Sequence, residues 1–169
     1  MLRRLRENGP VVLVPLAWTF AIAAHRDLLA LRTVLIAHLV MDSIILVFTV
    51  LSWRDMDAGI LLTWRRVLVA GFVLTAAGTV GLVTDPPTDA VLAGTVAGWL
   101  AIPAAGLLDT GRRIDRLPTI YLVGGALSAL GAVGYVLAVA GGAPLAVTAA
   151  LAVGGAGQTA GIVAAVVAY

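Results

Sequence analysis

His38 and Asp42 are the two residues of this chain whose types and spacing could do chemistry. They lie near the middle of a long apolar run from Arg32 to Trp53. Four residues apart on a helix, they are separated by about 40° around its axis and share one face, on which Thr49 also falls. A carboxylate at the centre of a bilayer costs about 2.5–3.5 kcal/mol on insertion scales. Asp42 therefore requires a partner, a proton or a function.

The chemistry that this pair suits best is proton binding. An imidazole and a carboxyl this close would titrate as one coupled unit, and histidine changes charge near physiological pH. A closed zinc site would need more ligands than His38, Asp42 and neutral oxygens supply. His25 lies roughly 15 Å from the depth of His38, so the two cannot be the axial pair of one haem, although ligation by a single histidine stays open. We expect no metal and no cofactor.

The composition indicates an integral membrane protein. Of the 169 residues, 61% are hydrophobic and 12% are charged, and the mean hydropathy is +1.05, whereas soluble domains are about 25% charged. Cysteine is absent and all 11 basic residues are arginine, which excludes thiol chemistry and lysine Schiff bases. The sequence contains no HExxH, GxSxG or P-loop motif.

Hydropathy predicts an all-α bundle of six transmembrane helices forming one domain over residues 1–169. The apolar runs are divided by short polar or Pro- and Gly-containing segments. A cleaved signal peptide is the weaker interpretation of the first run, which we expect to bend near Pro15. Residues 57–64 are expected to form either a short interfacial helix or the first turns of the third span. The spans are expected at residues 10–25, 28–53, 67–83, 90–108, 118–140 and 145–168.

The arginines predict the orientation of these spans. With six crossings and both ends inside, the outer segments carry only Arg26 and, at the start of the second span, Arg32. This asymmetry favours a multi-pass protein of the cytoplasmic membrane with both ends in the cytoplasm. Binding of anionic lipid headgroups would be a natural secondary effect. The arginines assigned to the inside are Arg3, Arg4, Arg6, Arg54, Arg65, Arg66, Arg112, Arg113 and Arg116.

Small residues and prolines suggest how the helices are organised. Gly94-x-x-x-Gly98 and Gly157-x-x-x-Gly161 are pairs that let helices approach closely, either within the bundle or across a homodimer. An offset of 86 residues aligns the two halves weakly and places a proline in the first span of each, Pro15 and Pro103. This pattern suggests a 3+3 inverted repeat, which is typical of transporters.

A polar or amphipathic side chain lies near the middle of every predicted span. The set has two interpretations, a hydrogen-bonded plug that holds the helices in register or a site that binds a ligand or a proton. We favour a binding site, because burying an ionisable pair costs more free energy than joining the helices requires. The proposed site residues are Trp18, His38, Asp42, Thr75, Trp99, Ser128, Gln158 and Thr159, and Thr79 lies at similar depth.

Three functions are compatible with this sequence. The first is a small carrier or channel-like protein, proton-coupled through His38 and Asp42. The second is a non-catalytic subunit, or a lipid- or pigment-binding scaffold, of a larger complex. The third is a membrane-embedded enzyme acting on lipid, with the same two residues as acid and base. The expected partners are the lipid bilayer and a second copy or a larger membrane complex, with no nucleic acid.

Overall fold

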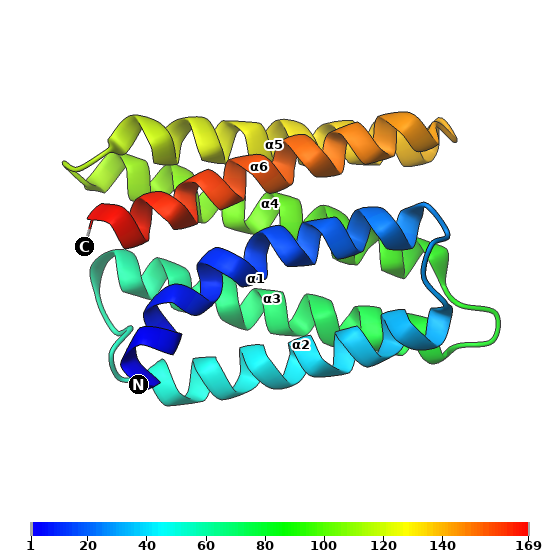
Figure 1. Ribbon diagram of the computed structural model, residues 1–169, viewed down its shortest axis with the longest axis horizontal. Coiled ribbons are helices and arrows are strands. Elements are labelled where there is room, and N and C mark those ends of the chain that lie inside the picture. Colours follow the sequence, from blue (N-terminus) through cyan, green and yellow to red (C-terminus); the bar gives the residue numbers. More distant parts are fainter. Residues whose placement is uncertain (1, 169) are drawn as a thin grey trace.

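The computed structural model describes residues 2–168, and the side chains of residues 11–167, as a bundle of six α-helices (Figure 1). Short connections join helices that run back and forth along the bundle. The start of α1, the end of α6 and the α2–α3 and α4–α5 connections lie at one end. The helices are α1 (Leu2–His25), α2 (Leu31–Ser52), α3 (Gly59–Val83), α4 (Asp89–Arg113), α5 (Pro118–Ala140) and α6 (Pro144–Ala168).

Five of these helices, α2 to α6, are long and apolar enough to cross a membrane. The apolar part of α1 is a shorter stretch, Val11–His25. In lipid every backbone N–H and C=O must be satisfied within the protein, which long helices achieve internally. The predicted all-helical bundle is therefore confirmed, whereas a crossing by α1, the orientation and the inverted repeat stay predictions.

The helix boundaries settle one question that the sequence left open. Residues 59–64 are the first turns of α3 rather than a separate interfacial helix. Gly59, which starts that helix, has φ of +58°, a backbone conformation that glycine adopts without a Cβ clash. At the same end of the bundle, α4 continues past the predicted end of its span to Arg113.

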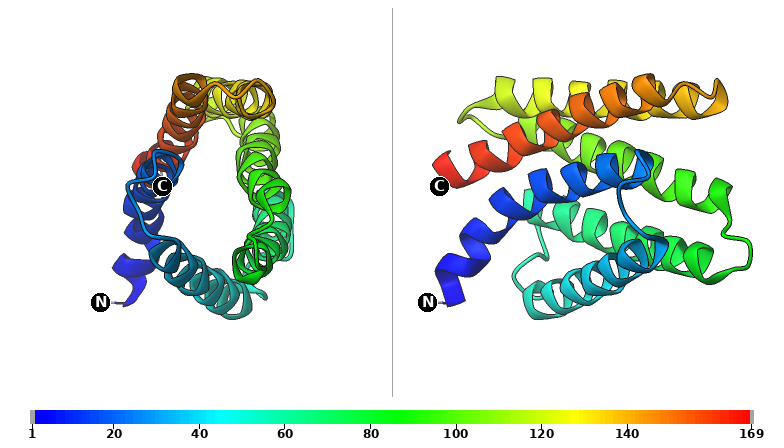
Figure 2. Two further views of the ribbon diagram at one scale, coloured as in Figure 1. Left: turned by 90° about the vertical axis from the view of Figure 1, so that its right-hand side faces the viewer. Right: turned by 45° about the vertical axis from the view of Figure 1, so that its right-hand side comes forward.

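Helix packing follows a fixed order around the bundle axis. The helices that pack on each other are α1 with α6, α6 with α5, α5 with α4, α4 with α3 and α3 with α2. The left view of Figure 2, along the bundle, shows this order. α1 and α2 are consecutive in the chain but do not pack closely along their length. α2 is therefore held laterally by α3 alone.

Close approach of α5 and α6 depends on glycine. A Cβ on Gly124 would lie 2.5 Å from the backbone oxygen of Gly157, and one on Gly131 would lie 2.8 Å from the backbone of Gly154. Gly161 packs against the Leu107 side chain of α4. One predicted glycine pair therefore serves packing within the bundle. In the other pair, Gly98 packs against Leu74 of α3, whereas Gly94 has open space beside it.

The substitution Gly124→Ala is expected to lower the free energy of unfolding by about 1–3 kcal/mol, because overpacking against backbone atoms cannot be relieved by a side-chain rotation. The measurement is a denaturant titration followed by circular dichroism in micelles. Gly94→Ala is the matched control, since nothing lies within 4 Å of the added Cβ. Equal destabilisation by the two substitutions would contradict this account of the α5–α6 contact.

Candidate functional site

A proline in the middle of α4 creates the first element of the buried polar network. Pro103 has no amide hydrogen, so the Trp99 carbonyl, four residues earlier, has no donor within the helix. Gln158 of α6 supplies one, since its Nε2 donates to that carbonyl oxygen at 2.8 Å. The amide side chain thus satisfies a backbone acceptor that would otherwise be unpaired inside the bundle.

Every polar atom of the Gln158 side chain has a partner. Nε2 also donates to Ser128 Oγ at 2.8 Å, and Oε1 accepts from Trp18 Nε1 at 3.1 Å. Ser128, which is fully buried, donates in turn to the Leu100 carbonyl at 2.7 Å. Gly155 makes room for the indole, because a Cβ there would lie 2.7 Å from Trp18 Cγ. This part of the network is a saturated structural plug.

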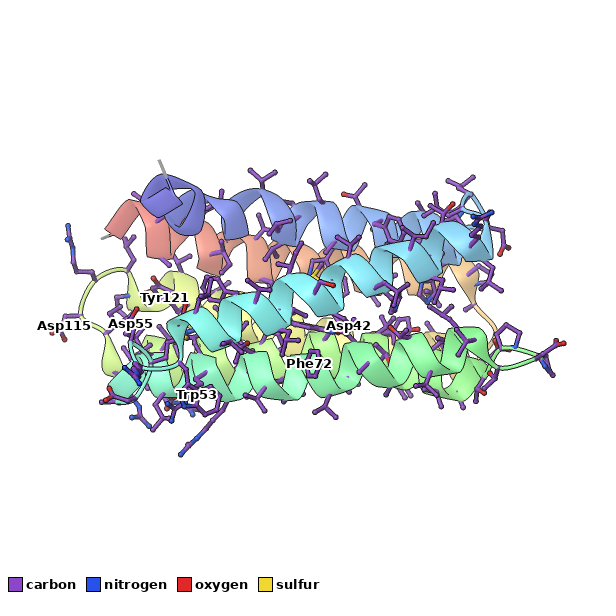
Figure 3. The ribbon with its side chains drawn as sticks, turned by 90° about the horizontal axis from the view of Figure 1, so that it is seen from below. Asp42, Trp53, Asp55, Phe72, Asp115 and Tyr121 are labelled. Carbon is purple, nitrogen blue, oxygen red and sulfur yellow. The ribbon has the colours of Figure 1, made fainter. Side chains whose placement is uncertain are left out.

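The network continues from α4 into α3 and α2. Trp99 Nε1 donates to Thr75 Oγ1 at 3.0 Å, and the ring fits because a Cβ on Gly71 would lie 2.5 Å from its Cη2. Thr75 donates to the Gly71 carbonyl at 2.9 Å. One turn further, Thr79 Oγ1 lies 2.8 Å from Asp42 Oδ2. Figure 3 shows Asp42 near the middle of the bundle's length.

A single series of hydrogen-bonded residues therefore involves all six helices. Every predicted site residue takes part except His38 and Thr159. Thr159 donates only to the Gly155 carbonyl of its own helix, at 2.7 Å. The participants, from α1 round to α2, are Trp18, Gln158, Ser128, Trp99, Thr75, Thr79 and Asp42.

Asp42 is incompletely paired, in contrast to Gln158. Its Oδ1 is buried and has no hydrogen-bond partner among the described residues. Its Oδ2 faces Thr79, whose hydroxyl also lies 3.1 Å from the Thr75 carbonyl oxygen. A hydroxyl has one hydrogen to donate and can accept as well. Thr79 can therefore donate to an ionised carboxylate, or accept from a protonated one while donating to the Thr75 carbonyl.

His38 and Asp42 have different hydrogen-bond partners. The Nδ1 of His38 lies 3.0 Å from the Val34 carbonyl oxygen, which can only accept, so Nδ1 carries a hydrogen. The ring lies against Gly78 of α3, where an added Cβ would be 3.2 Å from Cδ2. The two side chains thus share a face, as their spacing predicts, but each contacts α3 separately.

The buried face of α2 is its polar face. The buried residues of this helix are Ile45, Thr49 and Ser52, and they continue the line of His38 and Asp42 toward the α2–α3 connection. Thr49, only 7% exposed, has a hydroxyl oxygen without a hydrogen-bond partner among the described residues. Most large apolar side chains of α2 are exposed instead. A helix whose inward face is polar and incompletely paired is suited to lining a path for water or protons.

A hydrogen bond between half-buried His25 and buried Tyr135 was not predicted from the sequence. His25, at the end of α1, has its Nε2 2.9 Å from the Tyr135 hydroxyl of α5 and its Nδ1 2.8 Å from the Ala21 carbonyl. The carbonyl requires a hydrogen on Nδ1, so in the neutral ring Nε2 accepts from Tyr135. Neighbouring charged residues, which could have formed an interfacial cluster with His25, are exposed: Arg26, Asp27, Asp85 and Asp89. No sequence signal connects residues 110 positions apart.

Two further observations bear on the chemistry. Within the described part of the chain, no three His, Asp, Glu or Cys side chains are grouped closely enough to hold a metal ion. Comparisons of the chain with protein-family models, with curated proteins and with solved structures find no match. The arrangement of residues is therefore the sole basis for proposing a function.

Gln158→Leu is expected to lower the free energy of unfolding by about 2 kcal/mol, because it leaves the Trp99 carbonyl and the Trp18 N–H unpaired. Pro103→Ala restores an amide donor to that carbonyl. In the Pro103→Ala background, Gln158→Leu should therefore lower the free energy of unfolding by only about half as much. A double-mutant cycle in micelles measures the difference. Thr159→Val is the control, with little change expected. Strict additivity would contradict the proposed link between Pro103 and Gln158.

Proposed function

We propose that this protein is a small proton-coupled carrier of the cytoplasmic membrane, with Asp42 as the group that binds the proton. The observation that carries this proposal is the buried, unpaired Oδ1 of a carboxyl group near the middle of a membrane-spanning helix. An ionisable residue at this depth is expensive to keep and commonly marks a proton or ion pathway. The links among α1, α4, α5 and α6 do not depend on it, since Gln158 and Ser128 already join those four helices.

The surroundings of Asp42 support both protonation states without a rearrangement of heavy atoms. Thr79 can reverse the direction of its hydrogen bonds, as its distances to Asp42 and Thr75 allow. Such a hydroxyl can hydrogen-bond to the carboxyl in either protonation state. Thr49 and Ser52 extend the polar face of α2 toward the end of the bundle that carries most of the arginines, which the positive-inside rule assigns to the cytoplasm.

Infrared spectroscopy of reconstituted protein tests the proton-binding role directly. We expect a carboxyl stretching band that changes with bulk pH in the wild type and is missing in Asp42→Asn. Ser43→Ala is the control, because this neighbouring hydroxyl is exposed and donates only to the Leu39 carbonyl of its own helix. A band that stays constant at every pH would mean that no water reaches Asp42, and the carrier proposal would then be abandoned.

Thr49→Val separates function from stability. Replacing a buried, unpaired hydroxyl by an isosteric apolar group should leave the free energy of unfolding unchanged or slightly increase it. If Thr49 holds water on the path to Asp42, the rate of proton entry into proteoliposomes carrying an imposed pH gradient should fall at least about tenfold. Thr148→Val, which removes a hydroxyl bonded only to its own helix, should leave the rate unchanged. An unchanged rate in Thr49→Val would place the path elsewhere.

A non-catalytic membrane subunit is the second candidate, and the position of α2 favours it. This helix packs on α3 alone and exposes a long apolar surface that includes Leu39, Val47 and Leu51. A partner subunit could cover that surface as readily as lipid. Under this alternative Asp42→Asn folds and functions like the wild type, so the same infrared and flux measurements distinguish the two candidates.

A further inference from the structure

One face of α3 carries two arginines followed by apolar side chains. A phospholipid likewise carries a charged headgroup followed by apolar acyl chains. Leu62, Arg65, Arg66, Val69 and Ala70 follow the spacing of a single helix face and line a surface hollow together with Trp53. At 1.5 Å per residue, this face continues about 10 Å from the arginine pair to Val73. Val69 and Val73 are exposed. The hollow therefore has a cationic end and an apolar length.

The cationic end of this hollow is held in place by Trp53. The Arg65 guanidinium lies 4.6 Å from the centre of the Trp53 ring and donates from one terminal nitrogen to the Trp53 carbonyl at 3.1 Å. Guanidinium carries five N–H donors, so most of them stay available. Figure 3 shows Trp53 at the side of the bundle, at the end where the α2–α3 connection lies.

The neighbouring Arg66 is exposed and has no ion-pair partner among the described residues. No acidic side chain lines the hollow. Both arginines line the hollow and can attract the negative charge of a phosphate diester, whose oxygens arginine binds in a bidentate manner. Tryptophan is also a common residue at the level of lipid headgroups.

We infer that this hollow is a binding site for one anionic phospholipid, with its phosphate on Arg65 and Arg66 and an acyl chain along Val69, Ala70 and Val73. Both charge and shape favour this occupant over a free anion. A soluble phosphate compound would bind the arginines but leave the apolar side chains of the hollow uncovered. A zwitterionic lipid would bring a cationic headgroup to a cationic surface. The inference is independent of any role of Asp42.

Native mass spectrometry of the full chain in detergent, titrated with phosphatidylglycerol or phosphatidylcholine, tests the site. Phosphatidylglycerol should bind more tightly, and the double substitution Arg65→Gln/Arg66→Gln should weaken its binding by about tenfold or more. Arg112→Gln/Arg113→Gln removes another adjacent arginine pair at the same end of the bundle, in which Arg113 is ion-paired with Asp109 at 2.8 Å, and should have less than about a twofold effect. Glycerol 3-phosphate alone should not bind at the same concentrations.

Two additional variants keep the outcome interpretable. Ala70→Phe fills the apolar part without changing the charge and should also weaken lipid binding. Arg66→Gln alone preserves the contact between Arg65 and Trp53, so it tests the headgroup contact if the double variant proves unstable. Equal losses from both arginine pairs would reduce the effect to general electrostatic attraction and overturn the site. Unchanged lipid binding in Ala70→Phe would overturn the proposal that an acyl chain lies along Val69, Ala70 and Val73.

Discussion

The hydrogen bond between Gln158 and the Trp99 carbonyl is the interaction on which the centre of this bundle depends. Pro103 frees a backbone acceptor in a place where water cannot satisfy it, and an amide from another helix has to replace the missing N–H. With Gln158 fixed in that position, its side-chain amide also forms hydrogen bonds with Ser128 and Trp18. Ser128 and Trp18 then bring α5 and α1 to the same depth.

This constraint divides the buried polar residues into two groups with different consequences. Around Gln158 every donor and acceptor is paired, so the α4–α5–α6 part of the bundle behaves as a rigid support, reinforced by backbone contacts between glycines. Around Asp42 the pairing is incomplete, and α2 is attached laterally to α3 only. A carrier needs a fixed part and a part whose protonation can change, and the proposed function assigns these roles to the two groups.

Much of the fold, and a smaller part of the site, could be predicted from the sequence. Hydropathy located all six helices, and the residue types at mid-depth identified most of the network, including Gln158 and Asp42. Hydropathy cannot show which helices are neighbours, since lipid and protein surroundings are equally apolar. The i to i+4 spacing placed His38 and Asp42 on one face correctly, yet their hydrogen bonds go to Val34 and Thr79. Those partners depend on helix rotation and on the packing of α3, which spacing within one helix does not determine.

The pairing of α1 with α6 has a consequence for biogenesis. Trp18 and Gln158 are 140 residues apart, so their hydrogen bond can form only after synthesis has proceeded as far as α6. Until then Trp18 of α1 lacks the partner that accepts its indole N–H.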